Sequence, residues 1–255
     1  MTSFPLISVV VITFKRLELL RRTITSLLKV THYPNLELIL CDDGSPKSIQ
    51  EEMKKLPFDK FLFSKKNQGL GANTNKGIRE AKGKYILQLQ DDWECIGPSD
   101  FLELSIQLFN NRSDIGLIRF YDVSYLKYYE KYLYGNKSIK IFDNDQRGIK
   151  NGIFVYSDTP HIKRKRLHEE LGLYAEHIPM DKTEIDFCKR FIFGNKYKAA
   201  YIDGYDVFKH LGERQSFNPN AKKARIKKML SSNILTRIPM NTFLRIKRYL
   251  VRYLK

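Results

Sequence analysis

Apolar residues follow two alternating patterns along the first half of the chain. Continuous apolar runs, typical of strands buried on both faces of a sheet, occur at Ile7–Ile12, Leu36–Cys41, Lys60–Phe63, Tyr85–Leu89 and Ile115–Phe120. Segments with helical spacing lie between them, at Leu17–Lys29, Ser48–Leu56, Ala72–Ala81 and Ser99–Asn110. Ser99 is a candidate N-cap, and Gly83 is a stop signal after Ala81. This repetition predicts an α/β fold with a mostly parallel sheet that is flanked by helices.

The pattern changes after residue 120. Tyr121–Tyr134 is rich in tyrosine and lysine and has no clean period, and the segment at His161–Arg166 is polar and basic. Regular structure is expected again as a helix at Glu184–Phe193 and as a short strand at Lys198–Ile202. We expect this half of the chain to supply the second wall of a cleft that opens at the predicted sheet.

Two predicted strands end in paired carboxylates. The run at Tyr85–Leu89 leads into Asp91-Asp92, and the run at Leu36–Cys41 leads into Asp42-Asp43. Adjacent carboxylates repel each other, and a divalent metal with a phosphorylated ligand neutralises them well. Ligands of parallel sheets bind beyond the carboxyl ends of the strands, where Thr13 also falls. Taken singly, each acidic segment also suits a solvated turn, since Asp, Gly and Ser favour turns.

Composition narrows the class of protein. With 255 residues, 42% of them hydrophobic, the chain suits one folded α/β domain rather than a disordered segment. The three cysteines form no CxxC pair, which argues against a zinc ribbon or a disulfide framework and favours a reducing cytosol. No run approaches 18 apolar residues, so no transmembrane helix is expected.

The net charge of +17 is concentrated at the C-terminus. Residues 221–255 contain 11 Lys and Arg and no Asp or Glu, whereas the preceding 220 residues carry 34 basic and 28 acidic side chains. Within this tail, apolar and basic positions recur at spacings of three and four; they are Phe243, Ile246, Leu250 and Leu254 on one side and Arg245, Arg248, Arg252 and Lys255 on another. This pattern predicts a basic amphipathic helix that binds an anionic membrane surface. A helix packed on the main domain, or a nucleic-acid-binding segment, would carry similar charges.

Four motifs in order resemble a known enzyme family. The chain has Val-Val-Ile-Thr-Phe-Lys-Arg ending at Arg16, then Cys-Asp-Asp-Gly-Ser ending at Ser45, then the glycine-rich segment 67–77, and then Gln90-Asp91-Asp92. This order resembles the family 2 glycosyltransferases, which are inverting, nucleotide-sugar-dependent enzymes with the GT-A fold, a Rossmann-type sheet. The resemblance is close over residues 6–120 and weaker to residue 215.

The resemblance implies a domain organisation. Residues 1–220 would form one GT-A catalytic domain, with 1–120 as the nucleotide-sugar-binding half and 121–220 as the acceptor-side half. Residues 221–255 would be the membrane-association tail.

The resemblance also implies which residues hold the donor. Thr13 and Asp43 would contact the nucleobase and ribose, because a carboxylate accepts hydrogen bonds from uracil N–H and ribose hydroxyl groups. Arg16, Gly71, Asn75 and Asp91 would complete the nucleotide-sugar site. Family members often carry an arginine where this chain has Thr74, so that contact is lost or comes from Lys65 or Lys66.

The family's metal motif, Asp-x-Asp, is degenerate here, because Gln90 replaces the first acid. The resemblance assigns Asp92 as the principal ligand of Mn²⁺ or Mg²⁺, with His210 as a further ligand and Glu94 in reserve. A lone histidine is also common as an ordinary surface or structural residue.

An inverting transferase needs a general base. The resemblance places it at Glu184, with Asp186 as the alternative. A structural role is open for this segment, in which Thr183 or Asp181 caps a helix and Glu184 and Asp186 favour its N-terminal dipole.

The predicted function is therefore inverting transfer of a hexosyl or N-acetylhexosaminyl group from a UDP-sugar to a glycan or lipid-linked acceptor in cell-surface polysaccharide or glycoconjugate synthesis. The expected location is cytoplasmic and peripheral, on the inner face of the cell membrane, with no nucleic-acid partner. The alternatives are a non-catalytic sugar-nucleotide-binding homologue, suggested by Gln90, and a nucleic-acid-binding protein, suggested by the pI of 9.6.

Overall fold

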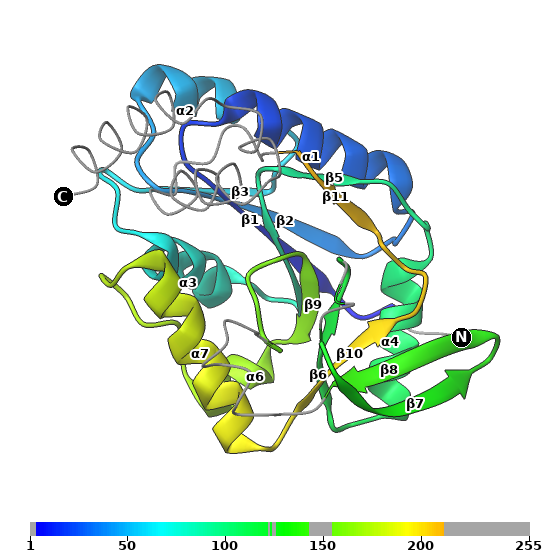
Figure 1. Cartoon of the computed structure of the whole chain (residues 1–255). Coiled ribbons are helices and arrows are strands. Elements are labelled where there is room, and N and C mark those ends of the chain that lie inside the picture. Colours follow the sequence, from blue (N-terminus) through cyan, green and yellow to red (C-terminus); the bar gives the residue numbers. More distant parts are fainter. Residues whose placement is uncertain (1–3, 122, 124–125, 143–154, 212–255) are drawn as a thin grey trace, which may run out of the picture. The chain divides into compact units, whose positions relative to one another are not determined.

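The computed structural model describes residues 4–121, 123, 126–142 and 155–211 (Figure 1). Nine strands form one sheet: β1 (Ile7–Thr13), β2 (Leu36–Asp42), β3 (Lys60–Phe63), β4 (Tyr85–Gln90), β6 (Ile115–Arg119), β7 (Tyr128–Tyr134), β8 (Lys137–Phe142), β9 (His161–Arg164) and β10 (Lys198–Ile202). Two short strands, β5 (Trp93–Cys95) and β11 (Phe208–His210), form a separate ladder. The helices are α1 (Leu17–Val30), α2 (Lys47–Met53), α3 (Leu70–Glu80), α4 (Phe101–Asn111), α6 (Arg166–Leu171) and α7 (Met180–Gly194).

The sheet is parallel in its first half and mixed beyond it. Its strand order is β3-β2-β1-β4-β9-β6-β10-β8-β7. The β1 strand pairs in parallel with β2 and β4, β2 pairs in parallel with β3, and β6 pairs in parallel with β10. The β9 strand runs antiparallel between β4 and β6, and β8 and β7 extend the far edge antiparallel. The α/β fold class that the sequence predicts is confirmed.

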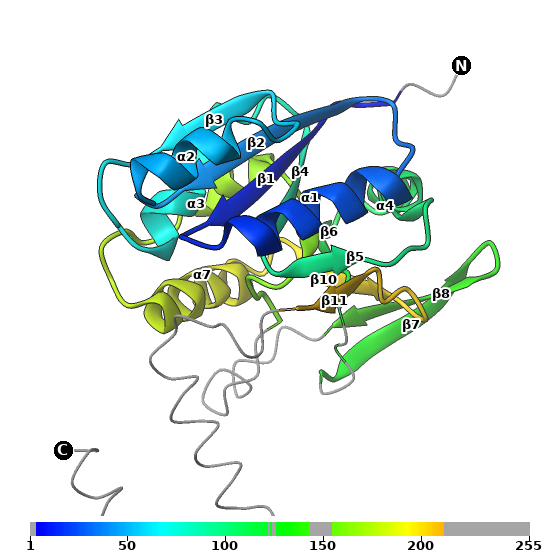
Figure 2. The ribbon, with the colours of Figure 1, turned by 90° about the horizontal axis from the view of Figure 1, so that it is seen from above.

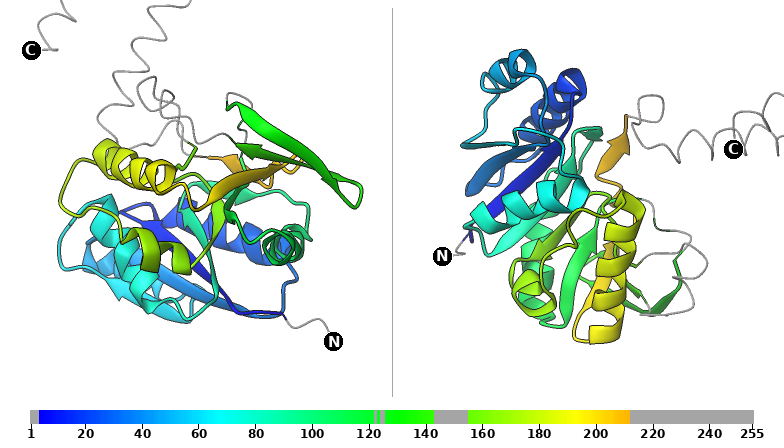
Figure 3. Two further views of the ribbon diagram at one scale, coloured as in Figure 1. Left: turned by 90° about the horizontal axis from the view of Figure 1, so that it is seen from below. Right: turned by 90° about the vertical axis from the view of Figure 1, so that its left-hand side faces the viewer.

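Both faces of the parallel part of the sheet are covered by helices, which explains why β1, β2 and β4 are largely apolar. In β1, Val9 and Val11 belong to the core shared with α1, α2 and α4 (Figure 2). Val10 and Ile12 belong to the core shared with α3, α6 and α7 on the other face (Figure 3). The carboxyl ends of β1, β2 and β4 therefore open at one edge between two helical layers.

Two predicted helix ends differ from the structure. The α4 helix begins at Phe101, so Asp100 and not Ser99 occupies the N-cap position. Asp100 makes no side-chain capping hydrogen bond. The α7 helix begins at Met180, four residues before the predicted start. The Pro179 carbonyl accepts the first N–H groups, those of Lys182 at 2.9 Å and Thr183 at 3.0 Å. Thr183 therefore lies inside the first turn, where it cannot cap the helix.

The tyrosine-rich segment without a clean period contains β7, the first strand of a hairpin. Strands β7 and β8 are joined at Gly135, whose φ of +59° suits the two-residue turn of a β-hairpin. The period is obscured because β7 is an edge strand in which every residue is exposed or half-buried. Alternation between apolar and polar positions is strong only where one face of a strand is buried.

The polar and basic segment at residues 161–166 contains the buried strand β9, which the sequence did not predict. Its lysine, Lys163, is fully buried and donates to Gln88 Oε1 at 2.7 Å, Tyr156 Oη at 2.9 Å and Tyr174 Oη at 3.0 Å. Arg164 donates through Nε to the Ile115 carbonyl at 2.7 Å. Buried polar groups are tolerated when they are hydrogen-bonded, so partners elsewhere in the chain make this strand possible.

The described residues up to Leu211 belong to one compact unit. The predicted amphipathic tail at 221–255 lies outside the described residues. Among the residues that are described, no helix is long and apolar enough to cross a membrane.

Candidate active site

The carboxylates that follow β4 meet the end of β1. Thr13 donates through Oγ1 to Asp91 Oδ2 at 2.6 Å, and Arg16 donates through Nε to the same oxygen at 3.1 Å. A second guanidinium nitrogen of Arg16 forms an ion pair with the other Asp91 oxygen. Arg16 also reaches Asp92, with 2.7 Å between Nη1 and Oδ2. One arginine after the first strand thus contacts both acids that follow the fourth.

The two adjacent aspartates have opposite pKa shifts. Burial raises the pKa of Asp91 to about 6, although Arg16 and Thr13 act to lower it. Burial also acts to raise the pKa of Asp92, but the hydrogen bond with His210 and the charge of Arg16 outweigh it, so the pKa of Asp92 is lowered. Asp92 is therefore the acid that its surroundings keep ionised.

His210 lies beside Asp92 because the ladder of β5 and β11 brings them together. His210 faces Trp93 across the ladder, the Leu211 N–H donates to the Asp92 carbonyl at 2.8 Å, and His210 Nε2 lies 3.4 Å from Asp92 Oδ2. The sequence predicts this pair as metal ligands, and the structure brings the two residues together. Glu94 points elsewhere, with Oε1 lying 3.4 Å from Nη2 of Arg22 on α1.

The donor atoms at this position fit a divalent cation that binds together with a phosphorylated ligand. Asp92 Oδ1 is buried and has no hydrogen-bond partner among the described residues, and the His210 imidazole lies next to the same carboxylate. No group of three or more His, Cys, Asp or Glu that could enclose a metal occurs in the described part of the chain. Mn²⁺ and Mg²⁺ are commonly held by one or two protein side chains plus substrate phosphates, and Asp92 and His210 match that arrangement.

A second acidic group lies beside the first. Gln90, the last residue of β4, donates through Nε2 to Asp158 Oδ2 at 2.5 Å, and the Asp158 N–H donates to Glu184 Oε1 at 3.1 Å. Burial and the neighbouring Glu184 carboxylate raise the pKa of Asp158 well above its usual range, and Asp92 adds to this shift. The structure therefore brings the predicted base, Glu184, to the strand end that carries the predicted metal ligand. Sequence reasoning missed Asp158, because Ser-Asp-Thr-Pro reads as an ordinary turn.

The alternative base is not part of this group. Arg190 donates to Asp186 Oδ2 through Nε at 3.1 Å and Nη2 at 2.6 Å, and Arg190 also donates to the Leu173 carbonyl at 2.8 Å. Asp186 thus holds an arginine that ties the loop after α6 to α7.

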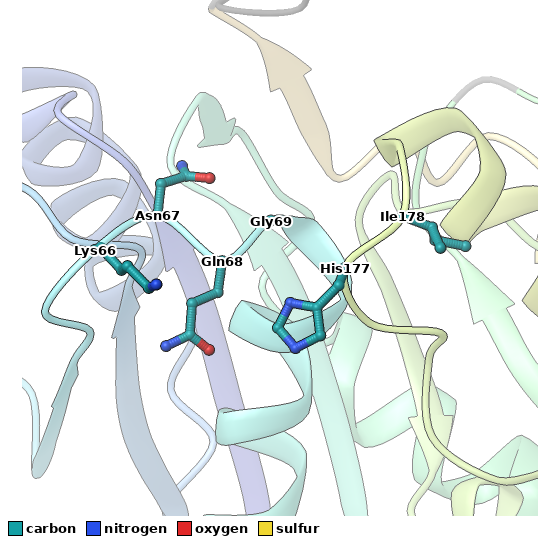
Figure 4. Close-up of a pocket in the computed structure, with 6 residues that line it drawn as sticks. All are labelled: Lys66, Asn67, Gln68, Gly69, His177 and Ile178. Carbon is teal, nitrogen blue, oxygen red and sulfur yellow. The ribbon is translucent and has the colours of Figure 1, made fainter.

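Asp43, which follows β2, holds the loop at Gln68 and Gly69 in place. Its two carboxylate oxygens accept the Gln68 and Gly69 N–H groups at 2.8 and 3.0 Å. That loop, with Lys66 and Asn67, lines one side of a hollow of about 500 Å³, and His177 and Ile178 line the other side (Figure 4). Burial raises the pKa of Asp43. Asp42, by contrast, closes a turn by accepting the Ser45 N–H at 2.9 Å.

Gly71 and Asn75 support the opposite side of this hollow. A side chain at Gly71 would collide with the Ala175 carbonyl. Asn75 is fully buried, donates to the Tyr174 carbonyl at 2.9 Å and accepts the Tyr174 N–H at 3.0 Å. Both residues therefore fix on α3 the segment that leads to His177. The structure gives them a positioning role, and their predicted contact with the nucleotide-sugar stays a prediction.

Comparison with known proteins agrees with the motifs. The model of the family described as Glycosyl transferase family 2 matches residues 8–172. An uncharacterized glycosyltransferase of Rickettsia bellii is 30% identical over 185 residues, which cover 70% of this chain and 26% of that protein. This chain thus spans about a quarter of that relative's length.

Solved structures with the same fold support the architecture. Staphylococcus aureus TarS 1–349, in complex with UDP-GlcNAc, has a TM-score of 0.60 at 17% identity and covers 79% of this chain and 57% of its own. The mannosyltransferase PcManGT of Pyrobaculum calidifontis, in complex with GDP-Man and Mn²⁺, has a TM-score of 0.53 at 16% identity. The match covers 80% of this chain and 59% of PcManGT. These similarities confirm the GT-A fold.

Proposed function

Since the chain belongs to glycosyltransferase family 2, we propose that it transfers a sugar from a UDP-sugar to a hydroxyl group of its acceptor, with inversion at the anomeric carbon. One observation carries this proposal. Asp92 and His210 lie together at the end of β4, and Gln90 of that strand end is linked through Asp158 to Glu184. Residues that can hold a phosphate-binding metal ion, with a base near the same strand end, suit glycosyl transfer.

The donor end of the proposed site uses the strand ends of β1, β2 and β4. Thr13 and Asp43 would hold the nucleobase and ribose, as the resemblance to the family implies, and Arg16 would supply a positive charge for the diphosphate. Asp92 and His210 would hold Mn²⁺ or Mg²⁺. When bound, that ion neutralises the charge of the departing nucleoside diphosphate. The UDP-GlcNAc complex of TarS and the Mn²⁺ complex of PcManGT support this choice of donor class and ion.

In the proposed transfer step, Glu184 takes the proton of the acceptor hydroxyl group. The freed oxygen lone pair forms the new bond to the anomeric carbon. The bond between that carbon and the phosphate oxygen breaks, and its electron pair leaves with UDP. Attack from the side opposite the leaving group inverts the anomeric centre. Arg16 stabilises the negative charge that develops on the leaving phosphate.

The acceptor is proposed from the sequence of the tail. A basic amphipathic helix at 221–255 would hold the enzyme on an anionic membrane surface, on the inner face of the cell membrane, where lipid-linked sugars are accessible. We therefore propose a lipid-linked sugar or a growing cell-surface glycan as the acceptor.

The test is nucleoside diphosphate release from a panel of UDP-Glc, UDP-Gal, UDP-GlcNAc, UDP-GalNAc and GDP-Man with Mn²⁺ and mixed lipid-linked acceptors. We expect turnover with a UDP-sugar, loss of turnover in excess EDTA, and UDP binding by calorimetry. Glu184→Gln should bind UDP as the wild type does and lose about 10²–10⁴-fold in kcat, because general-base catalysis contributes that much.

Asp186→Asn is the matched control, since it neutralises a carboxylate two residues away on the same helix. It should keep most of the turnover. An active Glu184→Gln with an inactive Asp186→Asn would move the base by two residues. Binding of UDP without turnover of any donor would instead favour the non-catalytic sugar-nucleotide binder that Gln90 suggests.

A further inference from the structure

We infer that Asp158 is the positioning residue of the base: together with Gln90 it fixes the Glu184 carboxylate at the end of β4. The inference rests on the proposed function, in which Glu184 deprotonates the acceptor. Two hydrogen bonds carry it, Gln90 Nε2 to Asp158 Oδ2 at 2.5 Å and Asp158 N–H to Glu184 Oε1 at 3.1 Å. No motif in the sequence points to Asp158.

The connection joins three elements that are distant in sequence. Gln90 ends β4, immediately before Asp91 and Asp92, and Gln88 pairs with His161 of β9. Asp158 precedes β9, so the antiparallel pairing brings it opposite the end of β4. Glu184 lies on α7, and Phe187 of the same helix packs against Tyr156, with ring centroids 4.6 Å apart, in the segment that leads to Asp158. Asp158 is thus the bridge between a rigid sheet and the helix that carries the base.

The charges of the group favour this bridge. Burial raises the pKa of Asp158, and a side-chain hydrogen bond and the charge of Glu184 raise it further, so that Asp158 is neutral beside Glu184. The neutral amide of Gln90 donates to Asp158 without adding a third carboxylate. This gives a physical reason for glutamine at the first position of the degenerate metal motif, since an ionised acid there could not donate to Asp158 Oδ2 as the Gln90 amide does and would add negative charge to the group.

Loss of the bridge should misplace the base without altering the donor site. Asp158→Ala keeps its N–H group but loses the contact with Gln90 that holds the segment, so Glu184 is free to leave its position. A base displaced by about 1 Å can lower the rate by about 10²-fold. Asp158→Asn is neutral and keeps a similar shape, and its side-chain oxygen still accepts from Gln90.

The experiment measures kcat and KM for UDP release, from whichever UDP-sugar of the panel the wild type turns over fastest, and UDP affinity by calorimetry with Mn²⁺. Asp158→Ala should lose about 10- to 100-fold in kcat, with KM for the donor and UDP affinity within about twofold of the wild type. Asp158→Asn should recover most of that loss. Asp181→Ala, which removes an exposed carboxylate from the first turn of α7, is the control and should match the wild type.

A second comparison separates positioning from general damage to the fold. In a Glu184→Gln background, Asp158→Ala should cause no further loss, because a residue that acts only through Glu184 has nothing left to position. Gln90→Met removes the same bond from the other side and should lower kcat in the wild type, again with KM unchanged. Wild-type kcat in Asp158→Ala, or an additive loss in the double variant, would overturn the inference. No turnover by the wild type would instead refute the proposed function itself.

Discussion

At the scale of single residues, His168 shows how burial makes this fold sensitive to acid. The imidazole is 5% exposed and packs against Tyr174 and Phe187, with ring centroids 5.3 and 4.9 Å apart. Nδ1 lies 3.2 Å from the Gly172 carbonyl, and Nε2 has no hydrogen-bond partner among the described residues. Burial, and then the charge of Lys163, lowers the pKa of His168 well below 6.5. Protonation of this ring therefore opposes folding.

We predict that His168→Phe weakens the acid sensitivity of the free energy of unfolding. Below pH 6.5 the unfolded chain binds a proton at His168 that the folded chain does not, so stability falls as the pH drops towards the lowered folded pKa. One such histidine contributes about 1.4 kcal/mol per pH unit. Urea unfolding at pH 7.5, 6.5 and 5.5 measures this slope, and His32→Phe, at an exposed position, is the control. Equal slopes in both variants and the wild type would contradict the prediction.

The residues of the candidate site differ in how well the sequence predicts them. The position of Thr13, Asp43 and Asp92 at the strand ends was predictable, because each lies at the end of an apolar run or just after one, and parallel strands bring their carboxyl ends to one edge. The structure brings His210 next to Asp92, and metal binding by the two residues stays a prediction. The contacts of Asp158 were not predictable, because they depend on the pairing of β4 with β9, which no local sequence pattern indicates.

At the scale of elements, β9 departs most from the sequence analysis. A strand in the middle of a sheet normally reads as a continuous apolar run, and this one reads as His-Ile-Lys-Arg. Lys163 is satisfied by Gln88 and two tyrosines, and Arg164 by backbone carbonyls, all from other segments. Propensity and period describe a segment alone, and they miss a strand whose polar groups are paired over long distances.

We predict that Ile162→Ala, in this apparently polar segment, strongly destabilises the protein. Ile162 is fully buried and pairs with Leu87 on one side and Ile118 on the other. Removing a buried side chain of this size costs about 2–5 kcal/mol. Leu133→Ala on β7 is the control, because Leu133 is 75% exposed and surface changes stay within about 0.5 kcal/mol. Similar denaturation midpoints for the two variants would mean that β9 is not a central strand.

At the scale of the whole molecule, the fold class was predictable and the extent of the sheet was not. Alternating strand and helix patterns over residues 7–120 determine a parallel sheet with helices on both faces. The second half adds β9, β8 and β7 antiparallel, and only β10 and α7 carried a clear pattern there. The hairpin escaped prediction because its first strand, β7, is an edge strand without a buried residue.

The tail is predicted to decide where the protein is located. The charges of residues 221–255 predict binding to an anionic surface, with about 1 kcal/mol per basic residue near it. We expect the full chain, and not residues 1–220, to co-sediment with vesicles that contain phosphatidylserine. Vesicles of phosphatidylcholine alone are the control and should bind neither protein. Equal sedimentation of the two proteins with anionic vesicles would remove the membrane role.

The central position of β9 also bears on how the chain is made. Translation delivers β4 and β6 first, yet β6 has both of its neighbours, β9 and β10, later in the chain, and β4 gains its second neighbour only with β9. A nascent chain that has emerged only to residue 120 therefore holds an apolar strand without a partner. Strands that pair with segments far away in the sequence fold slowly, and until they pair their exposed edges can aggregate with other chains. Residues 161–164 of β9 must emerge from the ribosome before β4 and β6 can be joined in one sheet. This topology therefore requires that the unfinished chain be protected from aggregation.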